Sequence, residues 1–419
     1  MSTPTPPAPT PHPPAPGPSA SPPAVTPVPA AERAVAPDVA RGLALLGIAI
    51  ANSVLHLWGV EVGVGSRPVD GSPVDRLVNG VVSLFVDRRT MPMFALLYGY
   101  GVGVVVRRRA AAWVPWPDCR RDLLRRAAWL VAFGVVHILL LFAGDILAIY
   151  GVAGLVAVAF VRAPGRRIAV VGVVALVLSG VLMGAVQALS VWAADQPDLM
   201  GQGDVMGGAE GSVLGAMLLR SWSVLIAPFG AVAALPLVLL GLWFARRGVL
   251  EQPAAHLPLL RRWVVGGLTA SVLGGLPMAL AVAEVWTPTA GQLFGVAALH
   301  EVSGTAGGVA FAAGVAWLVA ARGTTVATLG PVGRALRAVG TRSLTCYLLQ
   351  SVLFVLPLAA WAGGLGERLS SAGVVAWAVG VWLVTVAVAV ALERVGRRGP
   401  AEALYRRLVY RPGALVAAR

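Results

Sequence analysis

Long apolar runs recur along nearly the whole chain, and each is close to the roughly twenty residues that an α-helix needs to cross a bilayer. With 57% hydrophobic and only 12% charged residues, the chain cannot cover soluble domains with polar surface. The pattern predicts an all-α polytopic integral membrane protein of about ten transmembrane helices. The runs fall at about 42–59, 90–106, 125–142, 146–161, 168–190, 222–244, 263–283, 302–320, 343–361 and 373–392.

The positions of the arginines test this number of spans, because cytoplasmic loops are enriched in basic residues. Every second connection is rich in arginine, whereas the intervening ones hold mostly Asp, Glu, Gly and Pro. This alternation predicts that both termini are cytoplasmic. It also explains the net charge of +14 without a nucleic-acid partner. The arginine-rich connections are 107–126, 162–167, 246–262, 322–342 and the segment from 394 onward.

Composition divides the chain into three parts. Residues 1–38 are rich in Pro and Ala and hold few large apolar side chains, so they predict a disordered cytoplasmic tail. Residues 39–396 form the predicted transmembrane helical domain. Residues 397–419 form a basic cytoplasmic C-terminal segment.

The stretch between the first two spans has the pattern of an amphipathic helix. Apolar side chains between 77 and 85 share one face, and Asp75, Asn79 and Ser83 lie on the other. We expect this helix at the outer membrane surface. Arg88 and Arg89 follow it at the outer boundary of the hydrocarbon, where they need not be buried and are candidates for binding an anionic acceptor.

Ionisable and strongly polar groups inside spans are costly unless they face a partner or a cavity, so they are candidate site residues. Asn52 and His56 lie four residues apart in the first span and share a face. They either line a polar pocket, or Asn52 bonds a neighbouring helix and His56 lies at the interface.

His137 lies in the third span, about 18 Å of helix beyond Arg125 and so in the outer half of the membrane. Its imidazole is either a proton acceptor in a reaction or a packed group that bonds a backbone carbonyl. Asp145 opens the fourth span, where a carboxylate caps the helix, and the short turn before it also allows a contact with His137.

Other polar groups have ordinary explanations. His300 and Glu301 are expected at an exposed helix end, and hydroxyls such as those of Thr345 and Tyr347 usually bond back to their own helix. The glycines between 99 and 103 favour close helix packing over an ion filter. The chain has no soluble-enzyme motif and no Cys/His metal spacing, so no metal is predicted.

Several spaced motifs together resemble one family, the YeiB-like bacterial membrane proteins that carry the domain of unknown function 418. Cys346 stands where Asn is common in that family. The motifs are Arg41-Gly42-Leu43-Ala44-Leu45-Leu46-Gly47-Ile48 with Asn52; Phe94-Ala95-Leu96-Leu97-Tyr98-Gly99; His137 with Gly144-Asp145-Ile146-Leu147 and Tyr150; Gly340 and Arg342 with Ser343-Leu344-Thr345-Cys346-Tyr347-Leu348-Leu349-Gln350-Ser351; and Gly399-Pro400-Ala401-Glu402 with Arg406-Arg407-Leu408-Val409-Tyr410.

That family looks related to transmembrane acyltransferases, including acyltransferase-3 proteins and the heparan glucosaminide acetyltransferase. The resemblance implies a multi-pass protein of the bacterial cytoplasmic membrane that moves an acyl group from acyl-CoA to a hydroxyl or amine. The acceptor is then a small molecule, a glycan or a lipid. On this hypothesis His137 is the general base and Asp145 tunes it. The predicted substrate-binding residues are Asn52, His56, Arg88, Arg89, Tyr150 and Gln350, and Arg41 and Arg342 are predicted to bind the CoA phosphates.

Two other functions fit the same residues. In a transporter or lipid-linked flippase, Asn52, His137 and Asp145 would bind substrate or protons along an access pathway. In a non-catalytic membrane scaffold, the intramembrane polar groups would serve packing alone. The two halves of the chain show no convincing duplication, which places the transporter below the acyltransferase.

Overall fold

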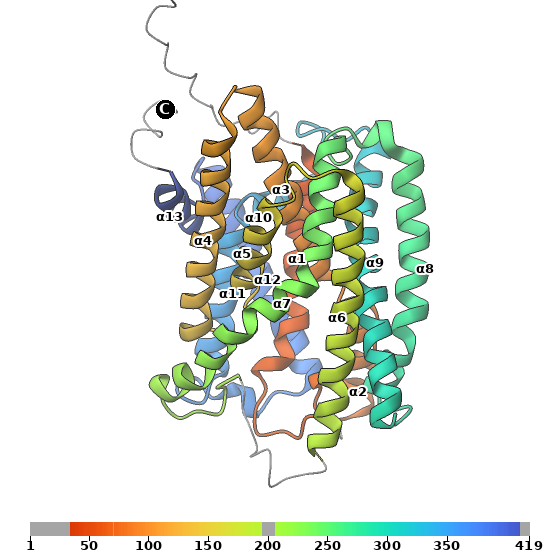
Figure 1. Ribbon diagram of the computed structural model, residues 1–419. Helices are drawn as coiled ribbons and strands as arrows, with labels where there is room; N and C mark the ends of the chain where they lie inside the picture. Colours follow the sequence, from red (N-terminus) through yellow and green to blue (C-terminus); the bar gives the residue numbers. More distant parts are fainter. Residues whose placement is uncertain (1–33, 70, 195–205, 411–419) are drawn as a thin grey trace, which may run out of the picture.

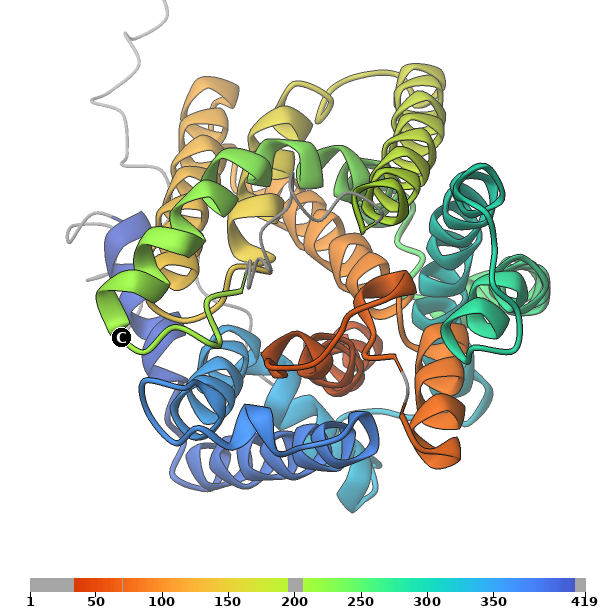
Figure 2. The ribbon, with the colours of Figure 1, turned by 90° about the horizontal axis from the view of Figure 1, so that it is seen from below.

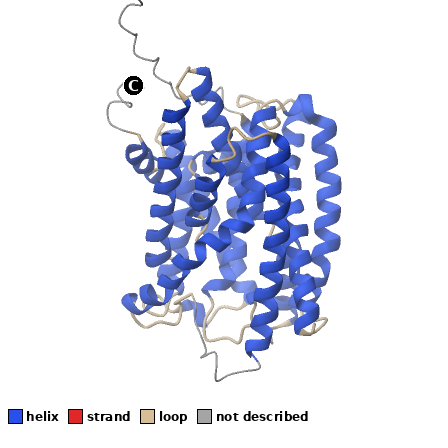
Figure 3. Cartoon of the chain, viewed as in Figure 1, coloured by secondary structure: helices blue, strands red, loops and turns tan. Residues whose placement is uncertain are grey.

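The computed structural model describes residues 34–69, 71–194 and 206–410. Within these residues the chain is a bundle of α-helices (Figure 3), and its β structure is limited to an isolated bridge between Val62 and Pro68. Most of the predicted N-terminal tail and the end of the C-terminal segment lie outside the described residues. The first helix begins at Val35, inside the stretch predicted as tail.

Each of the ten predicted apolar runs contains a helix. The α-helices of the described part are α1 (Val35–Ser53), α2 (Pro73–Phe85), α3 (Thr90–Ala111), α4 (Trp116–Leu140), α5 (Leu147–Val158), α6 (Gly165–Ala194), α7 (Val213–Arg247), α8 (Leu257–Val282), α9 (Ala290–Ala321), α10 (Pro331–Thr341), α11 (Ser343–Leu358), α12 (Ser371–Arg394) and α13 (Pro400–Val409). The 3-10 helices are η2 (Val54–His56), η3 (Val64–Ser66), η4 (Pro253–His256) and η5 (Leu365–Glu367).

Most of these helices are long enough to cross a membrane. In the described part of the chain, eight helical segments are long and apolar enough, and α10 with α11, bent by 87°, makes a ninth if the pair is one span. The apolar α5 has 12 residues, about 18 Å of helix, and is shorter than the hydrocarbon thickness. The chain is therefore a polytopic α-helical membrane protein, as predicted.

The basic loops all lie at one end of the bundle, at the top of Figure 1. We call this end, formed by residues 107–126, 162–167, 246–262, 322–342 and 394–407, the arginine-rich face. The loops 141–146, 283–289 and 359–370 lie at the other end, the opposite face. Alternate connections thus emerge at alternate ends of the bundle.

α1 lies in the interior when the bundle is viewed along its axis (Figure 2), and it packs against α3, α9, α10, α11 and α12. Glycines allow the closest approach between α3 and α7. A Cβ added at Gly99 would lie 2.0 Å from the carbonyl oxygen of Val238, and one at Gly241 would lie 2.0 Å from that of Leu96. Close helix packing is therefore the use of the glycines in α3.

The predicted amphipathic helix exists as α2, and its polar face is turned into the bundle. Asn79 and Ser83 are 1% exposed, whereas Leu77 on the other face is 65% exposed. The carboxylate of Asp75 accepts the backbone N–H of Ala372 at the start of α12 (2.8 Å). α2 therefore presents its apolar side outward, which is the arrangement expected of a helix in contact with lipid.

α13 lies outside the bundle at the arginine-rich face and is attached to the start of α11. The carboxylate of Glu402 in α13 accepts the backbone N–H groups of Leu344 (2.7 Å) and Thr345 (3.1 Å). The first N–H groups of a helix have no partner within the helix, and a carboxylate there also interacts favourably with the helix dipole. Glu402 thus fixes α13 to the first turn of α11.

Candidate functional site

His137 lies near the end of α4 and contacts a carboxylate and a hydroxyl with its two ring nitrogens. Its Nδ1 lies 2.8 Å from Oδ1 of Asp145, and its Nε2 lies 2.7 Å from Oγ of Ser351. The side chains of His137 and Asp145 are 0% exposed. Two parts of the chain that are far apart in the sequence therefore build one buried cluster, which we call the His137 cluster. They are α4 with the turn after it, and α11.

Asp145 has two functions in the structure, one for each carboxylate oxygen. Oδ2 accepts the backbone N–H of Ala148 in the first turn of α5 (2.6 Å), which caps the helix. Oδ1 faces the imidazole of His137. The capping and the additional contact with His137, which the short turn allowed, are both present.

Tyr347 and Ser351 complete the His137 cluster, and neither was among the predicted site residues. Both belong to α11, one turn apart on the same face. The Tyr347 hydroxyl accepts the backbone N–H of Ile146 (3.3 Å) and lies 3.5 Å from Oδ1 of Asp145, and its ring lies 5.0 Å from the ring of His137. The sequence signal was present in the motif 343–351, but a hydroxyl in a span is usually explained by a bond to its own helix.

A cavity of about 410 Å³ extends from the arginine-rich face to the His137 cluster. Its inner wall includes Ile146, which follows Asp145 in the chain, and Tyr347, whose hydroxyl contacts both the backbone N–H of Ile146 and the carboxylate of Asp145. Its outer wall includes Arg108 in α3 and Tyr410 after α13. This volume is within the range typical of small-molecule sites. Tyr347 lines the cavity and contacts the ring of His137, which is not itself part of the cavity wall.

Positive charge lines the cavity. The four basic residues of the wall are Arg41, Arg108, Arg126 and Arg406. Arg41 is held by Asp38 (2.9 Å) and by the backbone carbonyl of Leu97 (3.1 Å). Of the four, only Arg41 was a predicted site residue, because the positive-inside bias already accounts for arginines in these loops. Guanidinium groups around a cavity favour an anionic ligand.

Tyrosines share the wall of the cavity with these arginines. Tyr150 donates its hydroxyl to the carbonyl of Met91 (2.8 Å), and Tyr405 donates to the carbonyl of Arg126 (2.7 Å). Burial raises the pKa of Tyr405, and the nearby Arg126 guanidinium opposes this rise. The predicted residue Tyr150 therefore lies in the cavity wall, in α5, roughly one and a half helical turns beyond Asp145 in the chain.

A second, much smaller void of about 10 Å³ lies on the side of the His137 cluster toward the opposite face. His56 lines it and stacks between Phe142 (4.9 Å between ring centres) and Phe354 (4.8 Å). Phe142 also contacts the ring of His137 edge-on (6.5 Å). His56 thus lies one aromatic ring away from His137.

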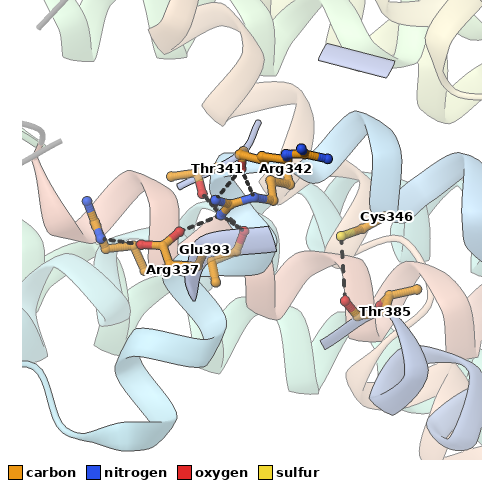
Figure 4. Close-up of polar contacts among 8 residues, drawn as sticks. Arg337, Thr341, Arg342, Cys346, Thr385 and Glu393 are labelled. Carbon is orange, nitrogen blue, oxygen red and sulfur yellow. Dashed lines mark hydrogen bonds and ion pairs between the residues drawn. The ribbon is translucent and has the colours of Figure 1, made fainter. Parts of the chain in front are cut away.

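Of the remaining predicted residues, Gln350 and Arg342 contact other groups of the protein, and Asn52 lines neither cavity. Asn52 is buried in α1, and Gln350 donates to the carbonyl of Leu45 (3.4 Å). Arg342 turns away from the cavity toward Glu393 (2.5 Å) and the carbonyl of Arg397 (2.8 Å), as Figure 4 shows for the Glu393 contact.

Figure 4 also shows Cys346, whose thiol contacts the carbonyl of Thr385 (3.9 Å). In the described part, both cysteines are free and buried, and no group of three or more His, Cys, Asp or Glu side chains could hold a metal ion.

The structure does not bring Arg89 to the His137 cluster. Arg89 lies at the break between α2 and α3 and is 0% exposed, so the expectation that it need not be buried is wrong. Its guanidinium donates to the carbonyls of Ser83 (2.9 Å), Asp87 (2.6 Å) and Ser271 (2.8 Å). It also lies 3.3 Å from the ring of His300. Glycines make room for it, because a Cβ at Gly275 would lie 2.1 Å from the guanidinium.

Neighbouring Arg88 pairs with Glu301 of α9 (3.4 Å) and contacts the sulfur of Met183 (3.1 Å). His300 and Glu301 are 5% and 4% exposed, so the expectation of an exposed helix end was wrong. They lie inside α9 because that helix begins ten residues earlier, at Ala290. We call Arg88, Arg89, Ser271, His300 and Glu301 the Arg89 cluster.

The fold and the His137 cluster define a polytopic α-helical membrane protein with a buried imidazole between a carboxylate and a hydroxyl. Comparison with known proteins gives its relatives. Residues 244–412 match the family described as "Protein of unknown function (DUF418)". This match and the relatives below confirm the resemblance to the YeiB-like family.

Two bacterial proteins are similar to the chain over most of its length. The "Uncharacterized protein YeiB" of Escherichia coli (strain K12) is 27% identical over 401 residues, covering 91% of this chain and 97% of its own. The "Uncharacterized protein YxaH" of Bacillus subtilis (strain 168) is 24% identical over 410 residues, covering 90% and 94%. No solved structure matches the chain.

Proposed function

We propose that the protein is a membrane-embedded O- or N-acyltransferase that moves an acyl group from acyl-CoA to a hydroxyl or amine acceptor. The observation that carries this proposal is the position of His137. Its imidazole lies between Asp145 and Ser351, next to a cavity of about 410 Å³ lined by four arginines. A proton acceptor, a carboxylate behind it and an anion-binding cavity are the groups that acyl transfer from a phosphorylated donor needs.

We further propose ten spans with both termini in the cytoplasm of a bacterial cell. In this topology α5 and the bent α10–α11 pair each complete one crossing, and the arginine-rich face is cytoplasmic. The cavity then opens toward the compartment that contains acyl-CoA. The acceptor, a small molecule, a glycan or a lipid, approaches from the opposite face, near His56 and α2.

The arginines of the cavity would bind the donor. Arg41, Arg108 and Arg406 lie in the same cavity wall, so their guanidinium groups would contact the phosphate oxygens of a donor bound there. The apolar and aromatic wall toward Tyr347 fits an uncharged chain such as pantetheine. The thioester of a donor bound in this way would point toward the His137 cluster.

His137 would act as the general base. The negative charge of Asp145, 2.8 Å from Nδ1, favours the tautomer that carries its proton there, which leaves Nε2 free to accept one. The carboxylate then stabilises the imidazolium that forms. Because the side chains are 0% exposed, the interaction is little screened by solvent.

Reconstituted vesicles test the proposal. The full chain in bacterial polar-lipid vesicles, with glucosamine and glycerol inside, receives radiolabelled acetyl-CoA outside. We expect CoA release outside and acetylated probe inside, both reduced about 10³-fold by His137→Gln. The control Arg121→Met changes a residue that is 75% exposed and does not line the cavity, and should keep the wild-type rate. Equal turnover by His137→Gln would exclude the proposed base, and probe movement without acetyl-CoA would favour a transporter.

A further inference from the structure

We propose that Ser351 carries the acyl group, so that transfer proceeds through a covalent acyl-serine and not directly from donor to acceptor. This inference rests on the proposed acyltransferase function. It assigns a role to a residue that the sequence patterns did not single out. It also gives a reason why the hydroxyl faces the imidazole.

The contacts of Ser351 are those of an activated nucleophile. Its Oγ lies 2.7 Å from Nε2 of His137, and Nδ1 of the same ring lies 2.8 Å from Oδ1 of Asp145. A serine hydroxyl is a weak nucleophile unless a base within hydrogen-bond distance takes its proton and a third group orients that base. The three side chains come from α4, the α4–α5 turn and α11, so the arrangement is a product of the fold and not of one helix.

A purely local role explains Ser351 less well. A buried serine in a helix is satisfied by its own backbone, as Ser179 is by the carbonyl of Leu176 (2.8 Å). The contact of Ser351 Oγ with its own helix, to the carbonyl of Tyr347 four residues earlier, is longer at 3.5 Å than its 2.7 Å contact with the imidazole. The shorter contact is therefore the one with His137.

Ser351 lies on α11 between the residues that line the two voids. Tyr347 lines the large cavity at the arginine-rich side, and Val355 lines the small void at the side of His56. Ser351 lies between them, one turn from each on the same helical face. The two voids share no lining residue. A carrier at this point needs only the acyl carbonyl to pass Tyr347, whereas direct transfer needs donor and acceptor in contact at once.

The chemistry balances in two steps. In the first, the Ser351 proton moves to Nε2 of His137, a bond forms between Oγ and the acyl carbon, and the thioester C–S bond breaks. The sulfur leaves as a thiolate and takes the proton from the imidazolium, so free CoA thiol departs toward the cavity. In the second, the acceptor hydroxyl or amine gives a proton to Nε2 and attacks the acyl carbon, and Oγ leaves and recovers the proton.

Acyl trapping tests the carrier. Full-length protein in nanodiscs is mixed with radiolabelled acetyl-CoA without acceptor, quenched in acid and examined by peptide mass spectrometry. We expect one acetyl group on the peptide that contains Ser351, and a burst of CoA equal to the protein concentration. The label should be absent in Ser351→Ala and in His137→Gln, and it should be present in the matched control Ser179→Ala.

A second variant covers the case in which Ser351→Ala does not fold, which gel filtration and thermal unfolding would show. Ser351→Cys keeps a nucleophile at the same position and should form a thioester that neutral hydroxylamine cleaves faster than the serine ester. A label on His137 or on any other side chain would overturn the proposal. So would a folded Ser351→Ala protein that transfers acetyl to the vesicle probes at the wild-type rate.

The same measurements separate this inference from the function on which it rests. If Ser351→Ala transfers normally while His137→Gln does not, the acyltransferase stands and the transfer is direct. If the wild-type protein neither releases CoA nor delivers acetyl to any probe, the acyltransferase proposal itself fails. An acetylated Ser351 that passes its label to an added acceptor establishes both.

Discussion

The His137 cluster and the Arg89 cluster are both buried polar groups inside a lipid-spanning bundle, but they differ in their surroundings. The guanidinium of Arg89 donates to carbonyls of α2, the α2–α3 junction and α8, and no residue of the Arg89 cluster lines either of the two cavities described above. The two ring nitrogens of His137 contact side chains that can exchange protons, and the neighbouring Tyr347 lines a cavity.

This difference separates a structural use of buried polarity from a chemical one. The main-chain carbonyls around the permanent charge of Arg89 hold three segments together, and a backbone carbonyl does not change its protonation state. An imidazole between a carboxylate and a hydroxyl can accept and return a proton. We therefore expect substitutions in the Arg89 cluster to lower stability and those in the His137 cluster to lower activity.

The largest effect should come from Asp145→Asn. The amide still accepts the Ala148 N–H, so the helix cap remains, but the charge that stabilises the imidazolium is lost. We expect the transfer rate in vesicles to fall about 10³-fold, equivalent to about 4 kcal/mol in the barrier, with little change in Tm. A drop in Tm with unchanged specific activity would place Asp145 with the structural residues.

Arg89→Met should cause the next largest change, and it should be in stability. Three carbonyls lose their charged donor, and we expect roughly 3 kcal/mol less stability toward denaturing detergent. The comparison variant Arg121→Met removes an exposed ion pair with Asp118 and should cost less than about 1 kcal/mol. Folded Arg89→Met protein that has lost only its transfer activity would contradict the division between the clusters.

Arg41→Gln should affect donor binding without affecting the chemical step. The side chain lines the cavity far from His137, so we expect the KM for acetyl-CoA to rise about tenfold, or about 1.4 kcal/mol, with kcat unchanged. Arg342→Gln is the matched test, because Arg342 was also predicted to bind phosphate and instead contacts Glu393. An equal rise in KM for both variants would show that the cavity wall does not bind the donor.

Tyr347→Phe should have the smallest effect. The hydroxyl accepts the Ile146 N–H at 3.3 Å and lies 3.5 Å from Asp145, so both contacts are long. We expect a two- to threefold change in transfer rate, about 0.5 kcal/mol, since the ring that lines the cavity and contacts His137 remains. A change as large as that of Asp145→Asn would make the phenol itself part of the reaction.

The helices were predictable because the length of an apolar run is read directly from consecutive residues of the sequence. Each apolar run contains a helix, and the arginine-rich connections lie at one end of the bundle. Which face of α2 points into the bundle was harder to predict. An amphipathic pattern fits both a helix on a membrane surface and a helix that packs its polar side chains against a bundle. The burial of Asn79 and Ser83 depends on α8 and α12, which are far away in the sequence.

Half of the candidate site, the contact between His137 and Asp145, was predictable from the sequence. His137 and Asp145 are eight residues apart on either side of a short turn, so their contact follows from chain connectivity. Ser351 is 214 residues from His137, and no local pattern relates the two. Similarly, Arg89 and His300 are 211 residues apart, and no local pattern predicts their contact inside the bundle.

The attachment of α13 has a practical consequence for how the protein can be shortened or tagged. Glu402 binds the first turn of the helix that bears Ser351, although it lies beyond the last membrane-crossing segment. Deleting the chain from Gly399 onward would therefore free the start of α11 while leaving every hydrophobic segment intact. Fusion partners are better joined after Tyr410 than in place of α13.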